Sequence, residues 1–285
     1  MVLAWNRYGK SHIRLVKVRR PQPDDGRTPH DVIDLTIDVQ LEGRFDAVYV
    51  DGDNAGCLAT DTMKNTVYAF ARTDPLDHPE AFALRLSDHF AAKPDVERVR
   101  ISMTQHPWQR LTSVGFPHPH AFVQSGTETW TAVIERVGHG AKVTAGVADL
   151  VVPKTTDSAF SGFPRDEYTT LPETEDRILA TSMTASWTYE TLDGVGYDFS
   201  AARARIRHAL LDTFAAHDSR SVQHTLYAMG RNALAACAEA SDITLTMPNR
   251  HHLPVDLTPF GLDNPNVVFV ATDQPFGLIE ATVRR

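Results

Sequence analysis

The sequence predicts an α+β fold, in which antiparallel sheets carry helices on one face. Residues 35–42 alternate strictly between apolar and polar side chains, which is typical of a strand with one buried face. Other segments place apolar residues three or four positions apart, the spacing of an amphipathic helix. Because the same order of strands and helices recurs in the second half of the chain, the sequence also indicates an internal structural repeat.

The first half of the chain supplies the first repeat. Met63, Val67 and Phe70 lie on one face of a predicted helix, and Pro79 opens the next helix. The flanking segments are rich in Val, Ile and Thr or alternate in polarity, and both patterns favour strands. The predicted strands cover residues 12–20, 35–42, 46–51, 96–106 and 120–137.

The second half repeats this order. Strands are predicted over 142–155 and 177–190, helices over 200–218 and 221–240, and closing strands over 243–247, 267–272 and 278–283. The predicted repeats are therefore residues 1–140 and 141–285, each with two strands, two helices and two further strands. Each half alone leaves sheet edges unpaired, so we expect identical subunits to close their sheets edge to edge.

Composition excludes several classes of protein. The 285 residues are 42% hydrophobic and 22% charged, as in ordinary globular proteins. A net charge of -8 with dispersed arginines gives no nucleic-acid surface. No apolar run reaches the ~20 residues of a membrane span, and the first residues lack the apolar core of a signal peptide, so we expect a cytoplasmic protein. Cys57 and Cys237 indicate neither a zinc knuckle nor a disulfide framework.

Histidines raise the question of a metal site. His118 and His120 can share one face of a strand, whereas the adjacent His251 and His252 would point in opposite directions. The chain has no HExxH motif, and no cysteine or carboxylate cluster accompanies these residues. We therefore favour scattered surface, turn and hydrogen-bonding roles over a catalytic metal, and we assign no metal ligand.

A hydroxyl and a carboxylate stand where the first long helix should begin. Thr60 and Asp61 follow an apolar segment, and both residue types are favoured at helix N-termini. The same position also suits an anionic ligand, because the positive end of the helix dipole attracts negative charge. The sequence leaves both interpretations open.

The long polar segment 154–171 is too long for a tight hairpin, and loops of this length usually carry function. Phe160 lies within it, and Arg177 opens the next strand. An aromatic face and a guanidinium group together suit a flat, anionic heterocycle, although Phe160 can also simply anchor the loop. Gln223, at the start of the last long helix, offers an amide donor and acceptor or is an ordinary first-turn residue.

Taken together, several segments spread along the chain resemble the urate oxidase (uricase) family. The most specific match is the long loop with the strands around it, where only Pro153 departs, since the family usually has Leu there. The matching residues are Tyr8 to Lys10, Ala59 to Asp61, Lys64 to Thr66, Leu150, Val152, Lys154, Thr155, Thr156, Ser158, Phe160, Phe163, Tyr168, Leu171, Arg177, Ser221 to Gln223, Pro248 to His251 and Gly277 to Thr282.

The resemblance implies the tunnelling fold (T-fold), with two tandem ββααββ repeats per subunit. Four subunits would form a homotetrameric barrel with active sites at the subunit interfaces. It also implies a reaction of purine degradation, in which urate, O2 and water give 5-hydroxyisourate and hydrogen peroxide. The family carries out this oxidation without a metal or an organic cofactor.

The resemblance further implies roles for individual residues. Lys10, Thr60 and His251 match the proton-relay positions of the family. The resemblance places Phe160 against the purine ring and Asn249 beside O2. The edge of the purine is held by Arg177 and Gln223, with the main chain of Val222 and the Asp61 region. The implied substrate-binding residues are Thr60, Asp61, Phe160, Arg177, Val222 through its main chain, Gln223 and Asn249.

Two alternatives accompany this interpretation. Other tunnelling-fold enzymes act on pterins and purines, some of them through a His-bound zinc. A metal-dependent hydrolase of this kind would require His118 and His120 to converge with a third ligand. A non-catalytic purine-binding protein is the second alternative, but it would not need both Lys10 and His251. The chain ends Val283-Arg284-Arg285, without a Ser-Lys-Leu peroxisomal signal, which agrees with the expected cytoplasmic location of a bacterial-type enzyme.

Overall fold

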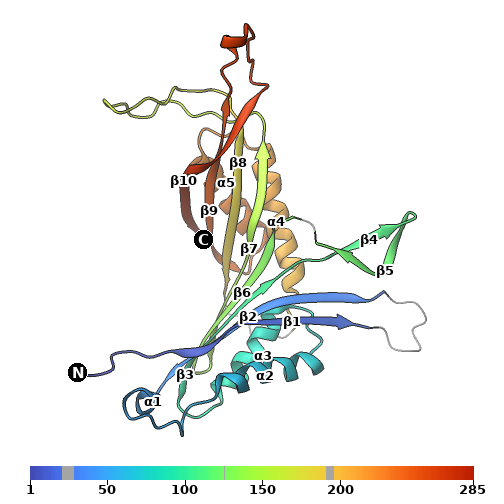
Figure 1. Ribbon diagram of the computed structural model, residues 1–285, viewed down its shortest axis with the longest axis vertical. Helices are drawn as coiled ribbons and strands as arrows, with labels where there is room; N and C mark the ends of the chain where they lie inside the picture. Colours follow the sequence, from blue (N-terminus) through green and yellow to red (C-terminus); the bar gives the residue numbers. More distant parts are fainter. Residues whose placement is uncertain (21–28, 125, 191–195) are drawn as a thin grey trace. The chain divides into compact units, whose positions relative to one another are not determined.

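The computed structural model describes residues 1–20, 29–124, 126–190 and 196–285. They form two compact units, shown in Figure 1. Unit 1 comprises residues 1–146 and 188–200, and unit 2 comprises residues 147–187 and 201–285. The predicted repeat boundary between residues 140 and 141 stays a prediction, because two strands each run from one unit into the other.

The main sheet has eight strands in the order β1-β2-β3-β6-β7-β8-β9-β10. The pairs β1–β2, β2–β3, β3–β6 and β9–β10 are antiparallel. Together with the helices described below, they confirm the predicted α+β fold with antiparallel sheets. The strands are β1 (Tyr8–Arg19), β2 (Asp31–Gly43), β3 (Val96–Gln105), β6 (Thr129–Val137), β7 (Gly140–Lys154), β8 (Leu179–Tyr189), β9 (Ala240–Pro254) and β10 (Phe269–Arg284).

Unit 1 builds its core between strands and two helices, α2 (Thr60–Thr73) and α3 (Pro79–Ala91). Leu35, Ile37 and Val39 alternate along β2 and are fully buried, as their polarity pattern predicts. Helix α3 packs against β3 and β6. The burial of large apolar side chains on these facing elements is the main source of their stability.

Two segments of unit 1 differ from the prediction. Residues 46–51 were expected to form a strand, but Asp46–Val50 form the short helix α1. An apolar run this short does not distinguish helix from strand by its periodicity. The predicted strand over 120–137 is interrupted, because β5 (Phe116–Val123) pairs with β4 (Gln109–Ser113) in a separate two-stranded sheet.

Unit 2 contains most of α4 (Phe199–Ala216) and all of α5 (Val222–Ala236), with a short 3₁₀ helix, η1 (Thr258–Phe260), in the segment that joins β9 to β10. Helix α5 packs against β9 and β10. Gly230 permits this approach, because a Cβ atom there would lie 2.7 Å from Cγ2 of Val283. The buried positions of β9 alternate, as predicted, through Ile243, Leu245 and Met247.

The two closing strands are longer than the sequence pattern suggested. Strand β9 continues past Met247 through both adjacent histidines to Pro254. The segments 267–272 and 278–283 belong largely to one strand, β10, whose pairing shifts register between Thr272 and Gly277. The polar residues at the end of β9 break the alternation, so sequence alone places the end of the strand too early.

The close approach of two backbones at Gly43 yields the first prediction. A Cβ atom at this position would lie 1.9 Å from the carbonyl oxygen of Asp95. Gly43→Ala therefore forces the end of β2 away from Asp95, and we expect it to lower the free energy of unfolding by about 1–3 kcal/mol. Urea denaturation monitored by circular dichroism measures this change.

Gly140→Ala is the matched control, because its nearest contact would be an ordinary 3.7 Å to the carbonyl oxygen of Val137. We expect that variant to be as stable as the parent or slightly more stable, since alanine restricts the unfolded chain. Equal stability of the Gly43 and Gly140 variants would contradict the inferred close approach.

Candidate functional site

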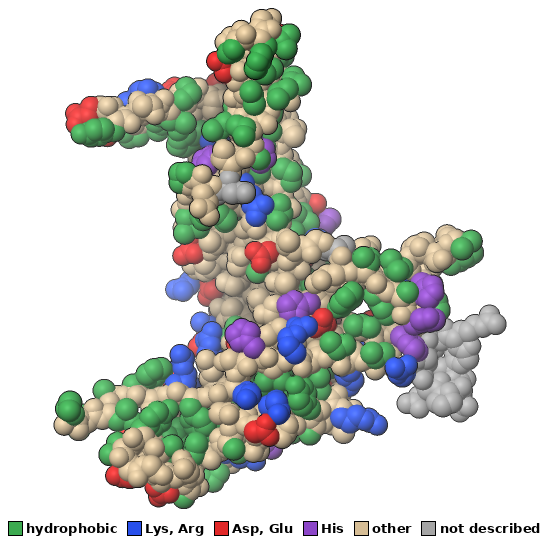
Figure 2. All heavy atoms as spheres, viewed as in Figure 1, with side chains coloured by type: hydrophobic (Ala, Val, Ile, Leu, Met, Phe, Trp, Pro, Cys, Tyr) green, Lys and Arg blue, Asp and Glu red, His purple; other side chains and the backbone are tan. Residues whose placement is uncertain are grey.

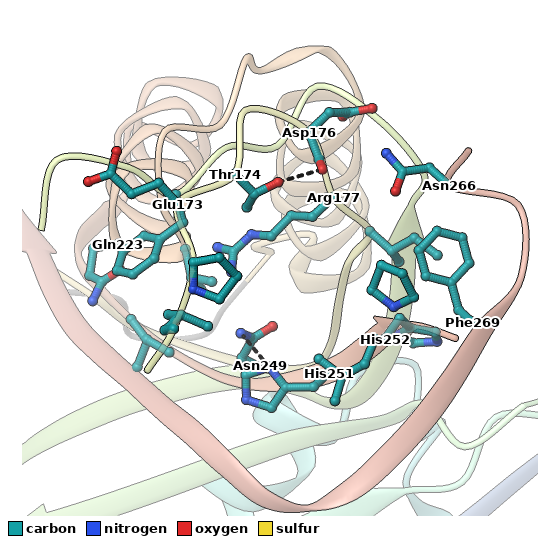
Figure 3. A pocket seen from close by; sticks show the side chains of 18 residues that line it. Glu173, Thr174, Asp176, Arg177, Gln223, Asn249, His251, His252, Asn266 and Phe269 are labelled. Atoms are coloured by element: carbon teal, nitrogen blue, oxygen red, sulfur yellow. Dashed lines mark hydrogen bonds between the residues drawn. The ribbon is translucent and has the colours of Figure 1, made fainter. Parts of the chain in front are cut away.

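Unit 2 contains a cavity of about 460 Å³ with a largely apolar lining. Its walls come from four parts of the unit: the end of the long loop after β7, the segment that leads into β8, the start of α5, and strands β9 and β10 (Figure 3). Such a concave apolar pocket with a few polar groups is typical of a small-molecule site. The lining includes six of the residues that the sequence predicted for substrate or proton transfer, namely Phe160, Arg177, Val222, Gln223, Asn249 and His251.

Among the described residues that line this cavity, Arg177 is the only lysine or arginine, and Glu173 and Asp176 are its carboxylates. The side chain of Arg177 extends into the middle of the pocket, with Asn249 and His251 on the opposite wall (Figure 3). Its Nε atom is enclosed and has no hydrogen-bond partner among the residues the structure describes. Burial lowers the pKa of the guanidinium group, which nevertheless stays charged at neutral pH. An enclosed cationic donor of this kind favours an anionic ligand.

Phe160 supplies an aromatic surface next to this charge. Its ring centroid lies 5.2 Å from Cζ of Arg177 and 4.9 Å from the ring centroid of Phe163, at an interplanar angle of 14°. The backbone of Phe160 is fixed by two hydrogen bonds with Thr174, its amide donating over 2.8 Å and its carbonyl accepting over 3.1 Å. The loop is therefore ordered at the residue that presents the ring.

The same loop is tied to the start of α5. The amide of Ala159 donates to the carbonyl of Ser219 over 2.7 Å, and the amide of Ser219 donates to the carbonyl of Asp157 over 2.9 Å. Ser221 caps α5 by accepting a hydrogen bond from the amide of His224 over 3.1 Å. Val222 and Gln223 thus lie in the first turn of a capped helix, beside the segment that carries Phe160.

Strand β9 contributes Asn249 and His251 to the pocket. Asn249 is 9% exposed, and its Nδ2 atom lies 3.4 Å from Nδ1 of His251. Alternate residues of a strand share a face, so their spacing of two explains why both reach the cavity. His252 was expected to point away from His251, but it also lines the pocket. Its Nδ1 atom lies 3.0 Å from the carbonyl oxygen of Arg250.

The structure places the other predicted residues in unit 1. Lys10 lies on β1, and Thr60 and Asp61 are the first two residues of α2. Neither Thr60 nor Asp61 is the N-cap, because Ala59 occupies that position without a side-chain hydrogen bond. A hydrogen bond from Lys64 and its positive charge lower the pKa of Asp61, with a smaller contribution from the charge of Lys10.

The predicted site residues therefore form two sets, one in each unit. Unit 1 holds Lys10 with the start of α2, whereas unit 2 holds the six residues around the cavity. The sequence did not predict the remaining pocket residues. They lie on segment 171–178, on β9 and β10, and between those two strands. These are Leu171, Pro172, Glu173, Thr174, Asp176, Ile178, His252, Leu253, Pro254, Asn266, Phe269 and Ile279.

The histidines that raised the question of a metal site lie on the β4–β5 hairpin. The ring centroids of His118 and His120 are 4.6 Å apart, and that of His30 lies 6.0 Å from His120. Figure 2 shows a group of histidine side chains on the surface beside the β4–β5 hairpin. Within the described parts of the chain, no group of three His, Cys, Asp or Glu side chains is placed to hold a metal ion. No described helix is long and apolar enough to cross a membrane.

Comparisons with known proteins agree with one another. The uricase family model matches residues 6–135 and 143–280. The uricase of Arthrobacter globiformis is 47% identical over 286 residues, which cover 100% of this chain and 90% of that protein. The uricase of Dictyostelium discoideum is 36% identical, and the match covers 98% of this chain and 96% of that protein. The crystal structure of the Arthrobacter globiformis uricase superimposes with a TM-score of 0.92 and covers 100% of this chain and 95% of that one. The chain therefore belongs to the uricase family.

Proposed function

We propose that the protein is a urate oxidase that converts urate, O2 and water to 5-hydroxyisourate and hydrogen peroxide. The observation that carries this proposal is the half-buried guanidinium group of Arg177, with its enclosed and unpaired Nε atom, beside the ring of Phe160. Urate is a planar anion with carbonyl oxygens and ring nitrogens along its edge. It therefore matches a pocket that offers an aromatic surface, a cation and an amide in one cavity.

Each pocket residue has a distinct part in holding urate. Phe160 stacks on the purine ring, while Arg177 donates to its edge and neutralises its negative charge. Gln223 offers both a donor and an acceptor, and the main chain of Val222 lies next to it in the same helical turn. These contacts orient the purine and lower the entropic cost of reaction.

The protein's chemical task is to remove a proton from urate and to keep O2 above the ring. The urate dianion is electron-rich enough to reduce O2 itself, so the reaction needs no resident metal or organic cofactor. Asn249, which is nearly buried, holds O2 and later the attacking water. Its neighbour His251 has one ring nitrogen that can donate and one that can accept, and it passes protons at the same wall of the pocket.

Lys10 and Thr60 complete the proton relay from unit 1. Lys10 acts as the base, and the Thr60 hydroxyl passes the proton, since a hydroxyl both donates and accepts. Asp61 lies in the first turn of the helix that Thr60 opens, and completes the contacts to the purine edge. The location of these residues in a different unit from the cavity supports a site assembled from two parts.

We further propose a homotetramer with active sites at the subunit interfaces. Strands β1 and β10 are the edges of the eight-stranded sheet, and unpaired edges favour pairing between chains. Hydrophobic side chains also gather near η1 and along β10 (Figure 2), where Phe260, Val268, Val270 and Leu278 are each at least 44% exposed. A second copy of the chain would cover these surfaces.

The activity itself is tested on chelator-treated protein. Incubation with urate and O2 should consume urate and release one equivalent of peroxide, with the same rate before and after removal of metal ions. The absorbance of urate follows consumption of the substrate, and a coupled assay follows release of peroxide. Metal-dependent hydrolysis of a purine or pterin would instead support the related zinc enzymes, and binding without turnover would indicate a non-catalytic purine-binding protein.

Arg177→Lys tests the role of the guanidinium group. Lysine keeps the charge but loses the planar pair of donors, and a hydrogen bond to a charged group contributes about 1.5–3 kcal/mol. We therefore expect KM for urate to rise by about ten- to hundredfold in steady-state assays. Arg220→Lys is the matched control, because Arg220 is an exposed arginine that pairs with Asp218 in the same unit. A KM that changes equally in both variants would refute the assignment.

A further inference from the structure

Tyr8 joins the two parts of unit 1 that carry the proposed relay. It lies on β1, two residues before Lys10. Its hydroxyl oxygen accepts a hydrogen bond from the amide of Leu58, with 3.0 Å between Oη and N. Leu58 in turn precedes Thr60, the first residue of α2, by two positions. One side chain thus connects the strand that carries the base to the segment that carries the hydroxyl.

The Tyr8 ring is itself held firmly. It packs edge to face against Phe45, with ring centroids 4.9 Å apart and an interplanar angle of 89°. Phe45 is 2% exposed, so this contact belongs to the core of the unit. The next residue, Gly9, approaches β2 so closely that a Cβ atom would lie 1.9 Å from the carbonyl oxygen of Val39. The packing against Phe45 and the close pairing of β1 with β2 therefore fix the position of the Tyr8 side chain.

The start of α2 depends on such a contact. Helix α2 begins at Thr60 without a side-chain cap on Ala59. The preceding residues 51–59 form turns and irregular backbone, with no strand or helix to hold them. In a segment of this kind, a hydrogen bond to a residue 50 positions away fixes the backbone more effectively than local turns do.

We propose that Tyr8 is a positioning residue of the proton relay, whose hydroxyl sets the location of Thr60 relative to Lys10. The proposal rests on the urate oxidase function proposed above. Small displacements of reacting groups cost large factors in rate, because proton transfer requires hydrogen-bond contact between donor and acceptor. The Tyr8 hydroxyl acts through the Leu58 amide and does not itself touch urate.

The protonation state of Tyr8 agrees with positioning instead of proton transfer. Burial, and then the neighbouring Cys57 thiol, raise the pKa of Tyr8 to about 12. The phenol consequently stays neutral throughout the neutral range and is poorly matched to act as a base there. It remains a stable acceptor for the Leu58 amide at every pH at which the relay works.

Tyr8→Phe tests the proposal, because it removes the hydroxyl and keeps the ring on Phe45. We expect kcat to fall by about tenfold or more, with a clearly smaller change in KM for urate and in the affinity for a non-reactive urate analogue, because most of the proposed purine contacts lie in the cavity of unit 2. Hydrogen exchange at the Leu58 amide should become faster, since its acceptor is lost. Tyr49→Phe is the matched control: the Tyr49 hydroxyl donates to the carbonyl of Arg7 over 3.3 Å in the same unit, and its removal should leave kcat unchanged.

Three results would overturn the positioning role. They are an unchanged kcat for Tyr8→Phe, a fall in kcat accompanied by an equal loss of analogue affinity, and a variant that does not fold. The second would assign the hydroxyl to urate binding, and the third would assign it to general stability. Parental protein that folds but does not oxidise urate would contradict the proposed function instead. In that case, the exchange rate of the Leu58 amide in Tyr8→Phe would still show whether Tyr8 holds this segment.

Discussion

The half-buried guanidinium group of Arg177, whose Nε atom is enclosed, is the constraint on which the pocket of unit 2 depends. A donor enclosed without a hydrogen-bond partner costs about 1–3 kcal/mol. Among the described residues, Nε of Arg177 has no hydrogen-bond partner. The ring centroid of Phe160 lies 5.2 Å from Cζ of the same side chain. A planar, anionic ligand would pair with the guanidinium group and stack on this ring. The long loop, the start of α5 and strand β9 all contribute residues to the cavity that Arg177 lines.

Irregular strand pairing accompanies both sets of proposed site residues. On β1, the register shifts between Lys10 and Ile13 directly after the proposed base. On β10, it shifts between Thr272 and Gly277, opposite the part of β9 that runs from Asn249 to His251. Bulges reorient side chains and end regular pairing, and they are frequent beside active sites. Each unit therefore has a register shift beside its proposed site residues: the proposed base in unit 1, and Asn249 and His251 in unit 2.

Much of the fold followed from the sequence because it depends on periodicity. The alternation along residues 35–42 predicted β2, and the helical spacing from Met63 to Phe70 predicted α2. The structure confirms both elements. The pattern failed where an apolar run was short, as in α1, or where a strand continues through polar residues, as in β9 beyond Met247. In those places, tertiary packing and not local pattern decides the conformation.

The candidate site was only partly accessible to the same reasoning. Phe160, Arg177 and Gln223 stood out because an aromatic ring, a guanidinium and an amide in polar segments suggested a ligand. Their roles, and the inclusion of Lys10 and Asn249, required the resemblance to uricases. His252 and the residues of β10 that line the pocket carried no signal, because a cavity is a property of distant segments brought together.

The central claim is that the relay of unit 1 and the pocket of unit 2 make one site only where two copies of the chain meet. Co-expression of a Lys10→Met chain with an Arg177→Ala chain, each bearing a different affinity tag, tests it directly. Each variant alone should be nearly inactive, since one lacks the base and the other the anion-binding cation. Doubly tagged oligomers should regain urate oxidation well above the sum of the two variants, because some interfaces combine an intact Lys10 with an intact Arg177. Doubly tagged oligomers without any recovered activity would contradict a shared site.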